Sequence, residues 1–262
     1  MAAPVFERAA ISARPITSYW SATRAPRYSL IFALPLFLLY ETLAAALATA
    51  PGNDGVRNAA DVALKTPFLL VSGARGSLAF FATVVGVCIF LVARDLTRAR
   101  DRLKPRLFAI MLGESAVLAL LLGVVVGTLT QRLLGALTAL AAPAGEPPLA
   151  SLGSSTRLML ALGAGLYEEL LFRVLLVGGL AAGLRWLLGR RNPVAGVLAA
   201  TAGALIFSAF HYVGAYGDRF ELASFTYRAV AGLAFSALYL VRGFGITAWT
   251  HALYDVSLLL IQ

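Results

Sequence analysis

The sequence predicts an all-α membrane protein, a polytopic transmembrane helical bundle of about seven spans, with six to eight as the range. Of the 262 residues 60% are hydrophobic and only 13% are charged, which leaves too little polar surface for a soluble domain of this length. Long apolar runs recur along the chain, and in lipid each must be a helix because only a helix satisfies its own backbone groups. We therefore expect the chain to be embedded in a lipid bilayer.

The predicted spans follow from runs of about 18 to 25 apolar residues. They cover residues 28–50, 77–93, 107–130, 157–181, 194–213, 225–241 and 244–261. The stretches 51–76 and 131–156 are rich in Ala, Gly and Pro and are expected to be external loops, with residues 67–73 as a candidate re-entrant piece. Glu41 inside the first run argues against cleavage after it, so this span is expected to remain as an anchor.

The distribution of basic residues predicts the orientation. The net charge of +9 falls largely in short segments that share one side if seven spans alternate. The positive-inside rule then places the N-terminus in the cytoplasm and the protein in the cell membrane as a multi-pass protein. Basic residues between apolar runs act as topology signals, so the positive charge does not indicate nucleic-acid binding. No nucleic-acid partner is expected. The oligomeric state is not indicated.

Two adjacent carboxylates lie inside the fourth run, in the segment Tyr167-Glu168-Glu169-Leu170-Leu171-Phe172-Arg173. One helical turn separates Glu169 from Arg173, so these two are expected to neutralise each other. In an α-helix Glu168 lies about 100° around the axis from Glu169 and has no such partner. Glu168 is therefore the better candidate for an acid or base, since ionisable groups within membranes are commonly functional.

The only two histidines fall in later apolar runs. His211 follows Phe207 by one turn, so an aromatic ring is expected beside its imidazole. The turn between the fourth and fifth runs lies midway between Glu168 and His211, which would bring these two residues to the same depth in an antiparallel hairpin. His251 and Asp255 form a further pair on one face of the last run. Packing alone accounts for either histidine singly, but three such groups on three helices favour a shared site.

These motifs resemble the CPBP family of intramembrane proteases, which includes the CAAX prenyl endopeptidases and abortive-infection-like proteins. The similarity consists of Glu-Glu-x-x-x-Arg, Phe-x-x-x-His and His-x-x-x-Asp, in this order over residues 167–255. It implies a catalytic core over residues 151–262, while the basic residues and apolar runs predict a cytoplasmic segment over residues 1–27 and N-terminal helices with external loops over 28–150. It further implies endopeptidase hydrolysis of a peptide bond in a membrane-associated protein or peptide.

The resemblance also implies roles for individual residues. Glu168 and His211 would activate water, His251 with Asp255 would complete the catalytic site, and Glu169, Arg173 and Phe207 would support it. Family members usually carry Asn where this chain has Asp255, and an ionised carboxylate cannot donate a hydrogen bond. Asp255 is therefore protonated, orients His251, or ligates a metal.

Zinc is an open expectation at this site. Glu168, His211, His251 and Asp255 offer nitrogen and oxygen atoms that zinc accepts, yet the sequence has no His-Glu-x-x-His helix. A glutamate-type mechanism without a metal is the alternative to a metalloprotease. Two other functions remain open: a membrane scaffold or immunity protein without proteolysis, and a proton-coupled transporter that uses its intramembrane carboxylates.

Overall fold

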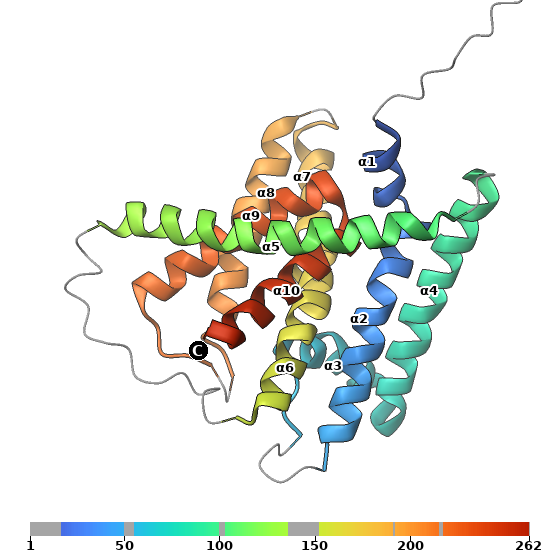
Figure 1. The fold of residues 1–262 in the computed structure, drawn as a ribbon, viewed down its shortest axis with the longest axis horizontal. Helices are drawn as coiled ribbons and strands as arrows, with labels where there is room; N and C mark the ends of the chain where they lie inside the picture. The colour runs from blue at the N-terminus through green and yellow to red at the C-terminus, as the bar shows by residue number, and fades with distance from the viewer. Residues whose placement is uncertain are drawn as a thin grey trace, which may run out of the picture.

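The computed structural model describes residues 17–49, 55–99, 103–135, 152–190, 192–214 and 217–261. Within these ranges the chain is helical and has no strand, which confirms the all-α prediction (Figure 1). The helices are α1 (Thr17–Arg24), α2 (Pro26–Leu47), α3 (Ala59–Ser72), η1 (Gly73–Arg75), α4 (Gly76–Ala99), α5 (Pro105–Leu134), α6 (Ser154–Gly163), η3 (Ala164–Val177), α7 (Gly178–Leu188), α8 (Pro193–Phe210), α9 (Leu222–Arg242) and α10 (Phe244–Ile261).

Six helical stretches among the described residues are long and apolar enough to cross a membrane, so the chain is a multi-pass membrane protein. They are Pro26–Leu47, Ala59–Arg98, Pro105–Leu134, Ser154–Leu188, Pro193–Phe210 and Leu222–Arg242. The seventh predicted span is a helix, α10, but is not among the six. Six spans lie within the predicted range of six to eight. The predicted orientation assumed seven alternating spans, and that number is not reproduced. The side of the membrane on which each end of the chain lies stays a prediction.

The predicted external loop over residues 51–76 is wrong for most of its length. Residues 59–72 form α3, whose first backbone N–H groups are capped by the Asn58 side chain. Pro67 lies inside this helix and obscured it in the sequence. Gly73 has a φ of +53°, a value that favours glycine, and ends α3. The chain then turns through η1 into α4, which packs against α3.

The other predicted loop, residues 131–156, is shorter than expected at both ends. Helix α5 continues to Leu134 and α6 begins at Ser154, while residues 136–151 lie outside the described part of the chain. Most of the predicted N-terminal segment, residues 1–16, also lies outside it.

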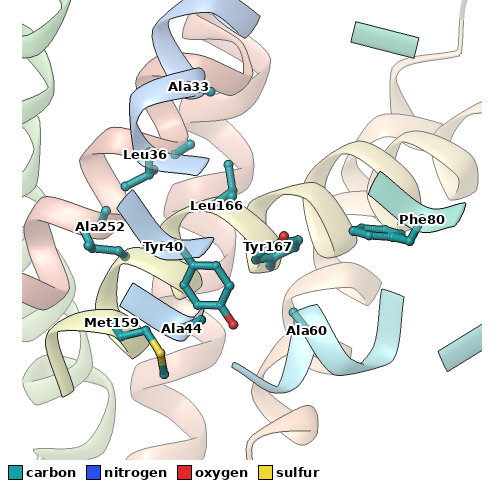
Figure 2. Close-up of a cluster of buried hydrophobic side chains, with 12 residues drawn as sticks. Ala33, Leu36, Tyr40, Ala44, Ala60, Phe80, Met159, Leu166, Tyr167 and Ala252 are labelled. Carbon is teal, nitrogen blue, oxygen red and sulfur yellow. The ribbon is translucent and has the colours of Figure 1, made fainter. Parts of the chain in front are cut away.

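Helix α10 lies at the centre of the bundle. It packs against α2, α5, α6, α9 and η3, and in Figure 1 α5 runs across it, crosswise to α2 and α4. The largest buried cluster joins α2, α3, α4, α6, η3 and α10, and Figure 2 shows Leu36 and Tyr40 beside Ala252 and Leu166. This packing fixes η3 between α10 and the first half of the chain.

The predicted hairpin between the fourth and fifth spans is present. Helix α7 ends at Leu188 and is followed by Gly189, which has a φ of +99°. Helix α8 begins after Asn192, whose side chain accepts a hydrogen bond from Val194 N at 2.9 Å. Pro193 occupies the first turn of α8, where its missing N–H costs nothing. The α7 and η3 segments therefore lie beside α8. This is the antiparallel hairpin that was predicted to bring Glu168 and His211 to the same depth.

Candidate functional site

The two adjacent glutamates lie on η3, which has π-helical rather than α-helical hydrogen bonding. Its last turn shows the wider spacing, since Gly178 N donates to Arg173 O, five residues earlier. The angle of about 100° expected between Glu168 and Glu169 assumed an α-helix, and nothing in the sequence indicates the wider turn. Segments of π-helix are rare and are frequent at functional sites.

Glu169 is completely buried and links two helices. Its Oε2 lies 3.2 Å from Arg173 Nε, so the predicted pair is present. Its Oε1 lies 2.7 Å from His251 Nδ1 on α10, a contact that the sequence did not indicate. The two carboxylate oxygens thus hold a buried cation on η3 and an imidazole on α10 at the same time.

Arg173 is only 1% exposed and lies between aromatic rings. Its guanidinium carbon is 4.4 Å from the centre of the Phe207 ring and 5.5 Å from that of Phe235. A cation over ring faces is stabilised by their negative charge distribution. The predicted supporting residues Glu169, Arg173 and Phe207 therefore form one connected group.

Glu168 is buried and accepts a hydrogen bond from Asn58, whose Nδ2 lies 3.0 Å from Glu168 Oε1. The donor comes from the N-terminus of α3, 110 residues earlier in the chain. Sequence reasoning missed Asn58. Its place before Ala-Ala-Asp is typical of a helix N-cap, but no pattern in the sequence shows that this cap faces Glu168.

His211 directly follows α8, and its Nδ1 lies 2.9 Å from the carbonyl oxygen of Phe207. A carbonyl only accepts, so Nδ1 carries the hydrogen and the neutral ring has its lone pair on Nε2. The Phe207 ring packs edge-on against the imidazole at 4.9 Å, as predicted. Burial lowers the pKa of His211 below its ordinary value, while the Glu168 carboxylate acts in the opposite direction.

Glu168 and His211 are close enough for their charges to interact, although no direct hydrogen bond joins them in the described structure. Each is instead held by a separate partner, Asn58 for Glu168 and the Phe207 carbonyl for His211. Among the described residues, the second carboxylate oxygen of Glu168 and the His211 Nε2 have no hydrogen-bond partner.

His251 lies between two carboxylates. Its Nε2 is 3.6 Å from Asp255 Oδ2 on the same helix, and its Nδ1 is bound to Glu169. A neutral imidazole that donates from Nδ1 has no hydrogen on Nε2, so the contact with Asp255 requires a second proton on either residue. The ring also stacks on Phe235 at 4.3 Å, which fixes its plane.

The other carboxylates in the apolar runs have partners outside this site. Glu114 on α5 pairs with Arg242 on α9 and accepts a hydrogen bond from Tyr19. Glu41 on α2 accepts hydrogen bonds from Tyr167 and from Lys65, whose Nζ lies at 3.2 Å. These pairings link helices to one another and leave Glu168, His211, His251 and Asp255 as a separate set.

The predicted zinc ligands are not gathered into a recognisable metal centre. Among the described residues no group of three or more His, Cys, Asp or Glu side chains is arranged to hold a metal ion. His251 directs one nitrogen at Glu169 and the other at Asp255, so its ring is already shared between two carboxylates. As arranged, these side chains do not fit zinc, and zinc stays a prediction.

Comparison with known proteins finds a similarity to one family over the second half of the chain. A family model described as Rce1-like, type II CAAX prenyl endopeptidase Rce1-like, matches residues 152–257. The matched segment begins before α6 and includes all four predicted catalytic positions, and it confirms the resemblance found in the sequence motifs. No curated protein and no solved structure matches the chain.

Proposed function

From the match of residues 152–257 to the family model of Rce1-like type II CAAX prenyl endopeptidases, we propose that this protein is an intramembrane endopeptidase. Its substrate is a membrane-associated protein or peptide. The observation that carries the proposal is the proximity of Glu168 on η3 and His211 at the end of α8, each fixed by its own hydrogen bond and each with one basic atom unused.

The reaction proceeds by attack of water on the scissile carbonyl. Water lies between Glu168 and His211 and gives up a proton as its oxygen bonds to the carbonyl carbon. General base catalysis of this kind contributes about 10² to 10⁴ in rate. The proton then passes to the leaving nitrogen as the carbon–nitrogen bond breaks, which regenerates both residues.

His251 is suited to stabilise the oxyanion. The flanking carboxylates of Glu169 and Asp255 favour a protonated ring, and a cation near the developing negative charge lowers its energy in a buried site. Asp255 then acts through His251 by orienting it. This assignment uses the positive charge of the ring, whose two nitrogens already face Glu169 and Asp255, and does not require a metal.

Substitution of Glu168 tests the proposal. Purified wild type in proteoliposomes is expected to cleave members of a library of membrane-anchored peptides, with and without C-terminal prenyl groups. Glu168→Gln and His211→Gln should lower kcat by about 10² to 10⁴ while the thermal unfolding midpoint stays near wild type. Glu221→Gln is the control, since Glu221 is an exposed carboxylate at the start of α9.

The alternatives predict different results. A membrane scaffold would lose stability rather than activity in Glu168→Gln, and a transporter would show proton-coupled flux that this variant abolishes without any cleavage. Total metal measured on purified wild type and on the folded His211→Ala/His251→Ala double variant tests the zinc prediction. Stoichiometric zinc in wild type that is lost from the folded variant would establish a metal site that includes the two histidines.

A further inference from the structure

Asn58 is oriented by the start of α3. Its Oδ1 accepts hydrogen bonds from Ala60 N at 2.9 Å and from Asp61 N at 3.4 Å. Rotation of the amide by 180° would place its NH₂ group against these two N–H donors, so the observed orientation is the only one with good hydrogen bonds. Nδ2 must therefore point away from α3, where it meets Glu168 Oε1 at 3.0 Å.

The start of α3 is itself fixed to α2. The Tyr40 hydroxyl donates to Asp61 Oδ2 at 2.8 Å and accepts from Asn58 N at 3.3 Å, so one side chain of α2 holds both residues. Figure 2 shows Tyr40 of α2 near Ala60 of α3 and Tyr167 of η3. Asn58 and Asp61 are 6% and 0% exposed, which keeps water from replacing these bonds.

Ion pairs close the same network. Lys65 Nζ lies 2.5 Å from Asp61 Oδ1 and 3.2 Å from Glu41 Oε1, and Arg57 lies within 3.4 Å of both carboxylates. Two cations and two carboxylates balance one another there. Asn58 therefore reaches Glu168 as a neutral donor, backed by a group whose charges are already compensated.

We infer that Asn58 is a positioning residue for Glu168, supplied by the half of the chain that precedes the family match. The inference rests on the proposed function. The amide hydrogen bond binds one carboxylate oxygen, turns the other toward the water, and favours the ionised form that accepts a proton. The catalytic site thus extends beyond residues 152–257 to the N-terminus of α3.

Two substitutions remove the amide NH₂ group that reaches Glu168 and keep the helix cap. Asn58→Asp and Asn58→Ser both retain a side-chain oxygen for the backbone N–H groups of α3. Both should lower kcat by about tenfold to a hundredfold, the range for loss of a hydrogen bond to a charged group, with KM within about twofold of wild type. Asn58→Asp should be the more severe, because it sets a second carboxylate against Glu168.

Asn192→Asp is the matched control. Asn192 caps α8 in the same way, through its Oδ1 and the N–H of Val194, and lies at an exposed turn. Its substitution should leave kcat and the unfolding midpoint unchanged. A purely structural role for Asn58 would lower the unfolding midpoint of Asn58→Ser without changing kcat of the folded protein, and that result would overturn the inference.

A second measurement does not depend on proteolysis. An apolar carbodiimide reacts with protonated carboxyl groups, and mass spectrometry of the peptide that contains Glu168 reports the extent of labelling at neutral pH. Labelling of Glu168 should increase severalfold in both Asn58 variants and stay at the wild-type level in Asn192→Asp. Equal labelling in all four proteins would overturn the positioning role. A wild type that labels as expected but cleaves no peptide would instead contradict the proposed function.

Discussion

Glu169 Oε1 lies 2.7 Å from His251 Nδ1, while Oε2 of the same carboxylate lies 3.2 Å from Arg173 Nε. A single buried side chain therefore ties η3 to α10 and sets the position of an imidazole of the site. The adjacent Glu168 accepts its hydrogen bond from Asn58, at the N-terminus of α3. Two neighbouring glutamates are thus expected to differ in function, one holding the helices together and the other acting on water.

Substitution of Glu169 should separate these roles. Glu169→Gln keeps the shape of the side chain but leaves Arg173, which is 1% exposed, without its ion-pair partner. Breaking a buried ion pair by removing one partner costs about 3 to 5 kcal/mol, so the free energy of unfolding should fall by about that amount. Glu168→Gln should change it far less. Chemical denaturation of both variants in detergent micelles measures the difference, and equal stabilities would contradict the assignment.

The tautomer of His211 predicts how kcat/KM falls on the acidic side of its pH profile. Burial lowers the pKa of His211, so its ordinary value of about 6.5 is an upper limit for the pH at which the ring becomes charged. The neutral ring offers Nε2 to water, and protonation blocks it. We therefore expect kcat/KM to be constant at neutral pH and to fall only below about 6.5.

His211→Gln provides the comparison for that profile. Its residual activity should lack the part of the acidic limb that belongs to the imidazole. A wild-type limb centred above pH 7 would show that another group controls the reaction.

Local patterns in the sequence predicted the helices of the second half and the residues that lie close on them. Spacing of four residues placed Glu169 by Arg173, Phe207 by His211 and His251 by Asp255, because a helix repeats at nearly that interval.

Contacts between distant segments could not be predicted in this way. The bond from Asn58 to Glu168 spans 110 residues. The segment around Asn58 is rich in Ala, Gly and Pro, a composition that predicts a loop rather than α3. The bond from Glu169 to His251 depends on how α10 packs into the bundle, which neither helix specifies alone.

The pair of Glu114 and Arg242 offers a test of stability away from the site. Arg242 is 1% exposed, and its Nε and Nη2 lie 2.5 and 2.7 Å from the two Glu114 oxygens. Glu114→Leu should reduce the free energy of unfolding by about 3 to 5 kcal/mol by leaving a buried unpaired cation. The double variant Glu114→Leu/Arg242→Leu should recover most of that loss. Cleavage per folded molecule should match wild type in both, and a lower kcat would show that this pair also acts on the site.

Gly165 should be required for the approach of η3 to α10. A Cβ at this position would lie 2.4 Å from the carbonyl oxygen of Ala248 and 2.6 Å from the Cβ of Ala252. Both contacts are on α10, on either side of His251, and neither can move without the helix. Gly165→Ala should therefore push α10 outward, lengthen the bond between Glu169 and His251, and lower kcat by about tenfold or more, because small displacements of catalytic groups are costly.

Gly179→Ala is the control for that substitution. Gly179 lies in α7, and a Cβ there would have no atom within 4 Å. Ala favours a helix over Gly by up to about 1 kcal/mol, so this variant should unfold at the wild-type temperature or slightly above it and keep full activity. Equal activity of the two alanine variants would mean that η3 and α10 tolerate separation, and that the contact of Glu169 with His251 does not control the reaction.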